Sequence, residues 1–205
     1  MSTNSGYEED AKNLIEAYES YSFETAHCRH LHLFPSAPCS ILEIGAGTGR
    51  DARALVDHGH EVWAVEPTDS FRSWAEETHP KTKLHWFDDA LPDLPKVNQL
   101  GVQFDFVFSS AVWMHLDKGQ RASALDAVSR LMKNGAELLI SFRYGPIPEG
   151  RRMFAVNVDE FLEEAEKFGF ELIERTQQAE TSDVFNRSDL SWIWVCLQKS
   201  GVGYE

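Results

Sequence analysis

Short runs of apolar residues alternate along most of this chain with stretches in which apolar residues recur at helical spacing. The runs are rich in Val, Ile, Phe and Trp, which is typical of strands that are covered on both faces. Gly, Pro and Asp residues separate the two kinds of segment. The pattern predicts strands at residues 41–44, 61–66, 83–87, 104–109, 136–142, 170–175 and 192–197.

Helices are predicted between these strands and before the first of them. Strands that alternate with helices indicate an α/β fold, with a mostly parallel sheet and helices on both of its faces. The last two strands differ, because the polar linker 176–190 has little helical pattern and favours an antiparallel last strand. The predicted helices cover residues 7–24, 50–58, 70–78, 118–133 and 157–168, and residues 25–38 are predicted as a short helix and a loop.

The length of 205 residues and the hydrophobic fraction of 42% suit one compact domain. We expect a helical lid segment at residues 1–38, the sheet domain at 39–199 and a tail at 200–205. The net charge of −14, from 33 acidic and 19 basic residues, disfavours a nucleic-acid partner. We expect a small-molecule substrate and either a monomer or a homodimer.

Cysteine usage and targeting signals favour a cytoplasmic protein. Cys28, Cys39 and Cys196 have no paired spacing, so neither a disulfide framework nor a metal site is expected. The first ten residues are polar and acidic, unlike a secretory signal. The sequence also lacks an apolar run of the roughly 20 residues that a membrane span needs.

A glycine-rich turn directly after the first strand is the strongest chemical signal. Glu43, Gly45, Gly47 and Gly49 occupy every second position, and a helical pattern follows at once. Glycine permits a sharp turn and close approach of a flat ligand, and the helix N-terminus adds unpaired N–H groups. Nicotinamide dinucleotides use the related pattern G-x-G-x-x-G, whose third glycine falls here on Arg50.

With this spacing and the acidic Glu66 that ends the second strand, the chain resembles the class I S-adenosylmethionine-dependent methyltransferases of the small, single-domain type 11/12-like group. The resemblance extends from Ser40 to Leu197 and implies a Rossmann-like sheet of seven strands with an antiparallel last strand. It implies S-adenosyl-L-methionine as cofactor and S-adenosyl-L-homocysteine as product. The implied cofactor-binding residues are Glu43, Gly45, Ala46, Gly47, Gly49, Glu66, Pro67, Asp88, Asp89, Ala90, Ser110 and Ala111.

The resemblance also implies roles within this set. Glu66 would accept hydrogen bonds from both ribose hydroxyls, because a carboxylate can accept two from a diol. Either Asp88 or Asp89 would contact the adenine amine, and the sequence leaves the choice open. Ser110 and Ala111, at the end of the fourth strand, would lie beside the reactive sulfonium.

The acceptor end of the site has fewer signals. His115 is the candidate general base, because it follows the fourth strand where the methyl group is expected. Tyr21, Arg143 and Tyr144 are the candidate substrate residues, and the loop 143–152 concentrates arginines that suit a carboxylate or phosphate. No metal site is expected.

The predicted function is methyl transfer to an oxygen, nitrogen or sulfur atom of an unidentified small acceptor. Three alternatives remain open. The chain could bind the cofactor without turnover, methylate a nucleic acid, or act as a nicotinamide-dependent oxidoreductase.

Overall fold

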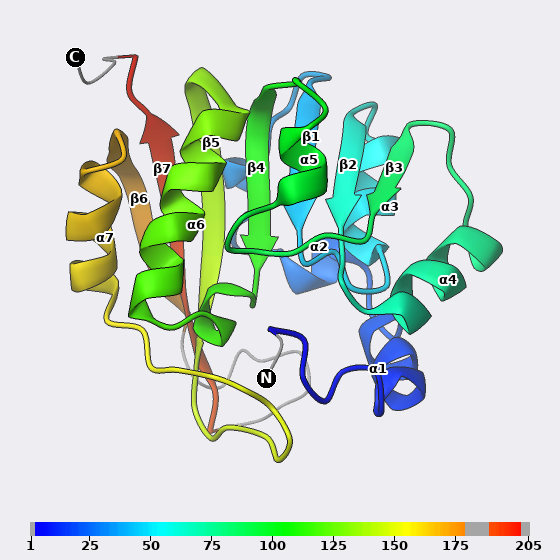
Figure 1. Cartoon of the computed structure of the whole chain (residues 1–205). Helices are drawn as coiled ribbons and strands as arrows, with labels where there is room; N and C mark the ends of the chain where they lie inside the picture. Colours follow the sequence, from blue (N-terminus) through cyan, green and yellow to red (C-terminus); the bar gives the residue numbers. More distant parts are fainter. Residues whose placement is uncertain (1–2, 179–188, 202–205) are drawn as a thin grey trace.

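The computed structural model describes residues 3–178 and 189–201, and these form one twisted sheet with helices on both faces (Figure 1). The seven strands lie in the order β3-β2-β1-β4-β5-β7-β6. They are β1 (Ser40–Ile44), β2 (Glu61–Val65), β3 (Leu84–Phe87), β4 (Phe104–Ser110), β5 (Met132–Tyr144), β6 (Phe170–Gln178) and β7 (Ser191–Lys199).

The predicted mixture of parallel and antiparallel strands is confirmed. β1 pairs in parallel with β2 and β4, and β2–β3 and β4–β5 are also parallel. β7 inserts between β5 and β6 and is antiparallel to both. Most of the linker predicted between the last two strands, residues 179–188, lies outside the described residues.

Two helical layers bury the two faces of the sheet. In Figure 1, α5 (Pro95–Asn98), α6 (Lys118–Leu131) and α7 (Val158–Glu166) lie in front, and α3 (Arg50–Asp57) lies behind. Val97, Leu125 and Phe161 pack with β-strand residues such as Leu138 in the front core. The rear core joins α3 and α2 (Phe23–Ala26) to the other face. Helices of the described residues are too short or too polar to cross a membrane.

The N-terminal region differs from its prediction. The single helix expected at 7–24 is divided into α1 (Ala11–Tyr18) and α2, because the Ser22 side chain caps the start of α2 by accepting the N–H of Thr25. A short 3-10 helix, η1 (Leu31–Leu33), follows. The predicted helix at 70–78 is α4 (Asp69–Thr78).

Two further boundaries were predicted wrongly. We expected α6 to extend to residue 133 and β5 to begin at 136, but Met132 is already extended and pairs with Phe104 of β4. Tertiary pairing therefore overrides the helical pattern. The short α5 and the 3-10 helix η2 (Trp113–His115) were not predicted as separate elements.

The topology places a crevice at the carboxyl ends of β1 and β4. These strands are neighbours, but the chain leaves β1 toward α3 on one face and β4 toward α6 on the other. A crevice that opens where the strand order reverses is the usual ligand site of such sheets. In Figure 1 the N-terminal segment and α1 lie across this edge of the sheet, with the loop that follows β5 beside them.

Candidate active site

A cavity of about 550 Å³ lies at this crevice, within the range expected of small-molecule sites. Its walls come from the ends of β1, β2, β3 and β4, from the N-terminal segment and from the loop after β5. Thirteen predicted site residues line it: Tyr21, Glu43, Gly45, Ala46, Gly47, Glu66, Pro67, Asp89, Ala90, Ser110, Ala111, His115 and Arg143. Gly49, Asp88 and Tyr144 are absent from the lining.

Those three residues have other surroundings. Gly49 is the residue before α3, with φ of 74°, and a Cβ there would lie 2.6 Å from the Trp86 ring. Asp88 is exposed and forms an ion pair with Lys96, 2.8 Å away. The hydroxyl of Tyr144 donates to the carbonyl of Val156, 2.7 Å away.

The backbone of the glycine turn packs directly against Val65 and Val112. Gly45 and Gly47 have φ values of 77° and 57°, in the left-handed region that favours glycine. The N–H groups of Gly45 and Ala46 both donate to the carbonyl of Val65 at the end of β2. A Cβ on Gly45 would lie 2.3 Å from a methyl group of Val112, so this position has no room for a side chain.

Glu66 is held by backbone amides of the segments that follow β1 and β2. Its Oε2 accepts the N–H of Gly47 at 2.9 Å, and its Oε1 accepts the N–H of Thr68 at 2.8 Å. Burial raises the pKa of this carboxyl above its ordinary value, although the hydrogen bonds from Thr68 and Gly47 oppose the shift. Each oxygen keeps a further lone pair with which it can accept from a ligand.

The two aspartates after β3 have separate roles. Asp89 is buried, and its Oδ2 accepts the N–H groups of Lys96 and Val97 at 2.7 and 3.0 Å. It therefore caps α5, which explains why that short helix forms where no local pattern predicts it. Asp89 lines the cavity and the exposed Asp88 does not.

A buried charged group lies under the glycine turn. Asp51 accepts from Arg50 Nε at 2.6 Å and contacts His27 Nε2 at 2.8 Å. Burial would raise the pKa of Asp51, but His27 and Arg50 outweigh this and hold it well below its usual range. Glu43 lies nearby and is fully buried, so burial raises its pKa well above its ordinary value.

Glu43 is also unusual in its hydrogen bonding. Its Oε2 is buried and has no partner among the described residues. A buried carboxylate oxygen without a donor is costly, by about 1–3 kcal/mol, unless a ligand supplies one. Tyr21 lies on the same wall, where the Arg50 guanidinium lies 4.4 Å from the centre of its ring.

The end of β4 carries local backbone strain. Ala111 has φ of 59°, which is rare for a residue with a side chain. Its N–H donates to the Ser141 hydroxyl at 3.0 Å, and that hydroxyl also contacts the Ser110 hydroxyl at 2.9 Å. Ser141 on β5 therefore holds the strained exit of β4, and Val112 follows as the residue that covers Gly45.

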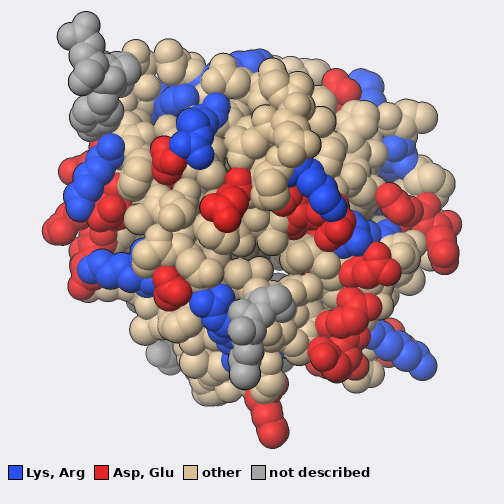
Figure 2. All heavy atoms as spheres, viewed as in Figure 1, with Lys and Arg blue, Asp and Glu red and all other residues tan. Residues whose placement is uncertain are grey.

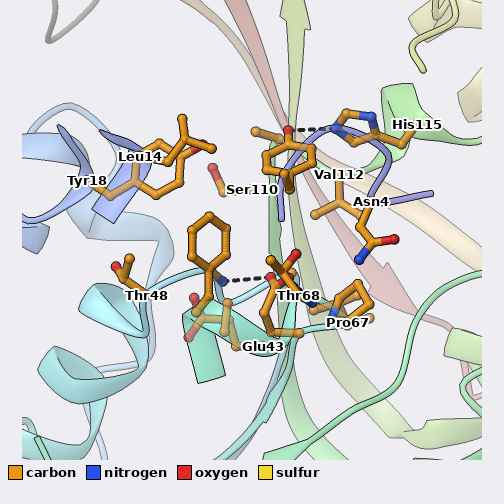
Figure 3. Close-up of a pocket in the computed structure, with 18 of the residues that line it drawn as sticks. Asn4, Leu14, Tyr18, Glu43, Thr48, Pro67, Thr68, Ser110, Val112 and His115 are labelled. Atoms are coloured by element: carbon orange, nitrogen blue, oxygen red, sulfur yellow. Dashed lines mark hydrogen bonds between the residues drawn. The ribbon is translucent and has the colours of Figure 1, made fainter. Parts of the chain in front are cut away.

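His115 is buried at the other end of the cavity, where the dashed line in Figure 3 marks its hydrogen bond. Its Nδ1 donates to the carbonyl of Arg152 at 2.7 Å, so its Nε2 is the acceptor of the Tyr7 hydroxyl at 3.0 Å. Burial lowers the pKa of His115 below its ordinary value; the Arg152 carbonyl opposes this shift, whereas Arg151, Arg152 and Arg143 strengthen it.

Several cavity residues were not identified from the sequence. Tyr7 was assigned only to a helix, and His27 only to the segment 25–38, which was predicted as a short helix and a loop. Asp51 could have been noticed, because it follows the glycine turn in the first turn of α3, where an acidic side chain is favourable. The described residues contain no group of three or more His, Cys, Asp or Glu side chains suited to a metal ion.

Comparison with known proteins agrees with this geometry. Residues 41–135 match the family model described as a methyltransferase domain. A methyltransferase of uncharacterised specificity from Staphylococcus carnosus is 32% identical over 110 residues, which cover 53% of this chain and 49% of that protein. The chain spans about half the length of the curated relatives it matches.

Solved structures show the same fold. A TehB-like S-adenosylmethionine-dependent methyltransferase from Corynebacterium glutamicum has a TM-score of 0.66 at 22% identity, covering 94% of this chain and 96% of that one. The 1,6-didemethyltoxoflavin-N1-methyltransferase of Burkholderia thailandensis has a TM-score of 0.68 at 17% identity, covering 95% and 84%. The matched sequence of residues 41–135 and the architecture together support a class I S-adenosylmethionine-dependent methyltransferase.

Proposed function

We propose that the chain transfers a methyl group from S-adenosylmethionine to an oxygen, nitrogen or sulfur atom of a small acceptor. The observation that carries the proposal is the junction of the glycine turn and Glu66 in one cavity, where the Gly47 N–H donates to the Glu66 carboxylate. This pairing presents a carboxylate beside a turn without side chains, as a nucleoside needs.

The residues present fit the cofactor. A Cβ at Gly47 would have only the Tyr18 ring within 4 Å, at 3.8 Å, so the bare backbone there leaves room for a ligand against the turn. The unpartnered Oε2 of Glu43 suits a donor such as the cofactor's ammonium group. Glu66 is assigned to the ribose hydroxyls, with Pro67 beside the adenine. Of the two aspartates, Asp89 and the adjacent Ala90 are assigned to the adenine edge because they line the cavity.

When bound, S-adenosylmethionine supplies an electrophilic methyl group on a positively charged sulfur. The chain then needs to align the acceptor, exclude water and receive a proton where the acceptor has one. Ser110 and Ala111 are assigned to the wall near the methyl group. His115 is assigned as general base, because the Arg152 carbonyl fixes its Nδ1–H and leaves the basic electron pair on Nε2. That electron pair accepts the Tyr7 hydroxyl, so a proton from the acceptor would reach His115 through Tyr7.

We assign residues 1–38 as a lid on the sheet domain at 39–199. Support comes from contacts at several points: Tyr7 binds His115, Glu8 accepts from the Ser70 backbone, and Arg53 binds Glu19 at 2.6 Å. Thr3, Asn4, Tyr7 and Tyr18 of this segment also line the cavity. A lid of this kind would exclude water from the reacting atoms.

A small acceptor is favoured over a nucleic acid. On the face shown in Figure 2, Lys and Arg side chains are interspersed with Asp and Glu, and the whole chain has a net charge of −14. The Burkholderia neighbour has 1,6-didemethyltoxoflavin bound together with S-adenosylhomocysteine. We assign the chain to the same broad class of small-molecule methyltransferases.

Calorimetric titration with S-adenosylhomocysteine and with NAD⁺ tests the cofactor. We expect binding of the first and none of the second, and the reverse result would overturn the proposal in favour of an oxidoreductase. Transfer of a labelled methyl group to a broad panel of hydroxyl, amine and thiol acceptors then separates an enzyme from a binding module. Cofactor binding without any methyl transfer across that panel would favour the module.

A further inference from the structure

Two of the three arginines that line the cavity lie at its acceptor end, and the third, Arg50, is paired with Asp51. Arg143 and Arg151 both line it there, next to Tyr7 and His115. The third arginine of the loop, Arg152, does not line it, because its guanidinium binds the His115 carbonyl and the Gln120 side chain. Arg143 also contacts the loop, since its Nη2 donates to the Pro146 carbonyl at 2.8 Å, but unlike Arg152 it lines the cavity as well.

Arg151 is the more unusual of the two. Its side chain is only 7% exposed, and its Nη1 is buried with no acceptor among the described residues. The carboxylate near it belongs to Asp10, which lies 3.3 Å from Nη2 and is itself 46% exposed. A buried guanidinium with one partly solvated partner is poorly compensated, because burial removes the hydration of the charge and a single partner replaces only part of it.

Aromatic groups complete the surroundings of Arg151. Its guanidinium lies 3.9 Å from the centre of the Tyr7 ring, and the Tyr7 hydroxyl donates to His115. Burial raises the pKa of Tyr7 to about 12, while Arg151 and Arg143 act to lower it. The same two arginines act to lower the pKa of His115. Both neighbours are therefore uncharged near pH 7, and the positive charge of the arginines is not neutralised by them.

We propose that the acceptor carries an oxyanion, a carboxylate or a phosphate, that binds Arg151 and Arg143 beside the Tyr7–His115 pair. This inference rests on the proposed methyl transfer, since it describes the second ligand of the same cavity. Arginine suits the role because its planar donors match the oxygens of both anions. The oxyanion fixes the acceptor so that its nucleophilic atom faces the methyl group and stays within reach of the Tyr7–His115 pair.

A competing explanation is that Arg151 only fastens the lid through Asp10 and Tyr7. The two explanations differ in what they expect of a small anion. A fastening arginine is already occupied and gains nothing from benzoate or phosphate. An arginine that awaits a ligand binds them saturably, and it does so more strongly when the lid is closed over bound S-adenosylhomocysteine.

The experiment is a titration of the S-adenosylhomocysteine complex with sodium benzoate and, separately, with inorganic phosphate, at constant ionic strength. The signals of the His115 ring are followed by NMR and are assigned with the variant His115→Asn. We expect at least one anion to shift these signals saturably and to raise the His115 pKa, whereas the neutral isostere benzamide leaves them unchanged. The two anions distinguish a carboxylate acceptor from a phosphate acceptor.

Variants locate the site. We expect Arg151→Gln to weaken anion binding tenfold or more. We expect Arg143→Gln to weaken anion binding as well, and this variant keeps the contacts of Arg151 with Asp10 and Tyr7. The matched control is Arg130→Gln, an exposed arginine on α6 that pairs with Asp126, and it should bind as the wild type does. If Arg151→Gln fails to fold, Arg143→Gln and Arg151→Lys decide the question.

The outcomes separate the two proposals. If S-adenosylhomocysteine binds but neither anion shifts His115, or if Arg143→Gln and Arg130→Gln bind the anions equally, the oxyanion site is wrong and the methyltransferase proposal stands. If S-adenosylhomocysteine does not bind while an anion shifts His115 through Arg151, the proposed function fails and the oxyanion site stands.

Discussion

Replacing Gly45 by alanine should damage both stability and cofactor binding, and the structure gives the size of each contribution. With φ of 77°, Gly45 lies in the left-handed region, where a side chain costs about 1–2 kcal/mol. The new Cβ would also lie 2.3 Å from Cγ2 of Val112. Forcing Val112 off its rotamer costs about 0.5–1.5 kcal/mol more. The free energy of unfolding should therefore fall by about 2–3 kcal/mol.

Gly101→Ala is the matched control, because it introduces the same strain of a side chain at a left-handed φ but no contact like that with Val112. Gly101 has φ of 65°, and a Cβ there would meet nothing within 4 Å. It should lose only about 1–2 kcal/mol. Each Gly→Ala substitution also lowers the conformational entropy of the unfolded chain, which stabilises the fold. This effect is the same for both variants, so it cancels when their free energies of unfolding are compared. Urea unfolding, followed by circular dichroism, measures both values.

The double variant Gly45→Ala/Val112→Ala isolates the clash. If Val112 is the obstacle, a double-mutant cycle should recover about 0.5–1.5 kcal/mol, the rotamer cost of the single variant. Affinity for S-adenosylhomocysteine should also fall in Gly45→Ala, because Val112 lines the cavity and would be pushed into it. Equal stability losses in Gly45→Ala and Gly101→Ala, with no coupling in the cycle, would refute this account of the turn.

Other perturbations give further expected outcomes. Glu66→Gln should weaken S-adenosylhomocysteine binding by about 1–3 kcal/mol in calorimetry, through loss of charged hydrogen bonds. The wild-type affinity should fall as the pH drops through the raised pKa of Glu66, because the protonated carboxyl accepts fewer bonds, and Glu66→Gln should not show this dependence. Asp51→Asn should lower stability by about 3 kcal/mol or more in urea unfolding, since it leaves His27 and Arg50 buried without their carboxylate. The pKa of Asp51 is depressed in the fold, so its stabilisation is present above the unfolded pKa of a carboxyl, and the difference between Asp51→Asn and wild type should shrink as the pH falls below it.

The meeting of the glycine turn and Glu66 in one cavity was predictable because both positions are local in the sequence. The glycine turn follows β1 without interruption, and Glu66 directly follows β2, so strand prediction alone brings them to one edge of the sheet. The parallel register of Ile44 with Val65 then sets the distance between them. The positive φ values in the turn favour glycine, so the glycines at these positions are visible in the sequence.

The elements that were predicted wrongly depend on partners distant in the chain. α5 forms because Asp89 accepts the N–H groups of Lys96 and Val97. The spacing of apolar residues in this segment does not predict a helix. β5 begins at Met132 because Phe104 pairs with it across the sheet. Propensity within a short window carries no information about either contact, so tertiary structure decides both boundaries.

The acceptor end was the least predictable part for the same reason. Tyr7 and His115 are 108 residues apart, and their hydrogen bond has no counterpart in local pattern. The loop arginines were visible as a concentration of charge, but their division into Arg151 at the cavity and Arg152 against Gln120 depends on side-chain packing. A loop can place these arginine side chains in many ways whose backbone conformations have similar free energies.

The two ends of the cavity also differ in charge, and this difference explains why they are built from different parts of the chain. At the proposed cofactor end, Glu43 lies on β1 and Glu66 directly follows β2, where rigid backbone holds buried carboxyl groups for a ligand that carries positive charge on nitrogen and sulfur. At the proposed acceptor end, Arg143 lies on β5 and Arg151 on the loop beyond it, against the N-terminal segment around Tyr7. Under the two proposals each end complements the charge of its ligand, and in a cavity that excludes water such complementarity acts at low dielectric. A fold that holds a methyl donor at the ends of its strands would therefore exchange one acceptor for another through changes in the N-terminal segment and in the loop after β5.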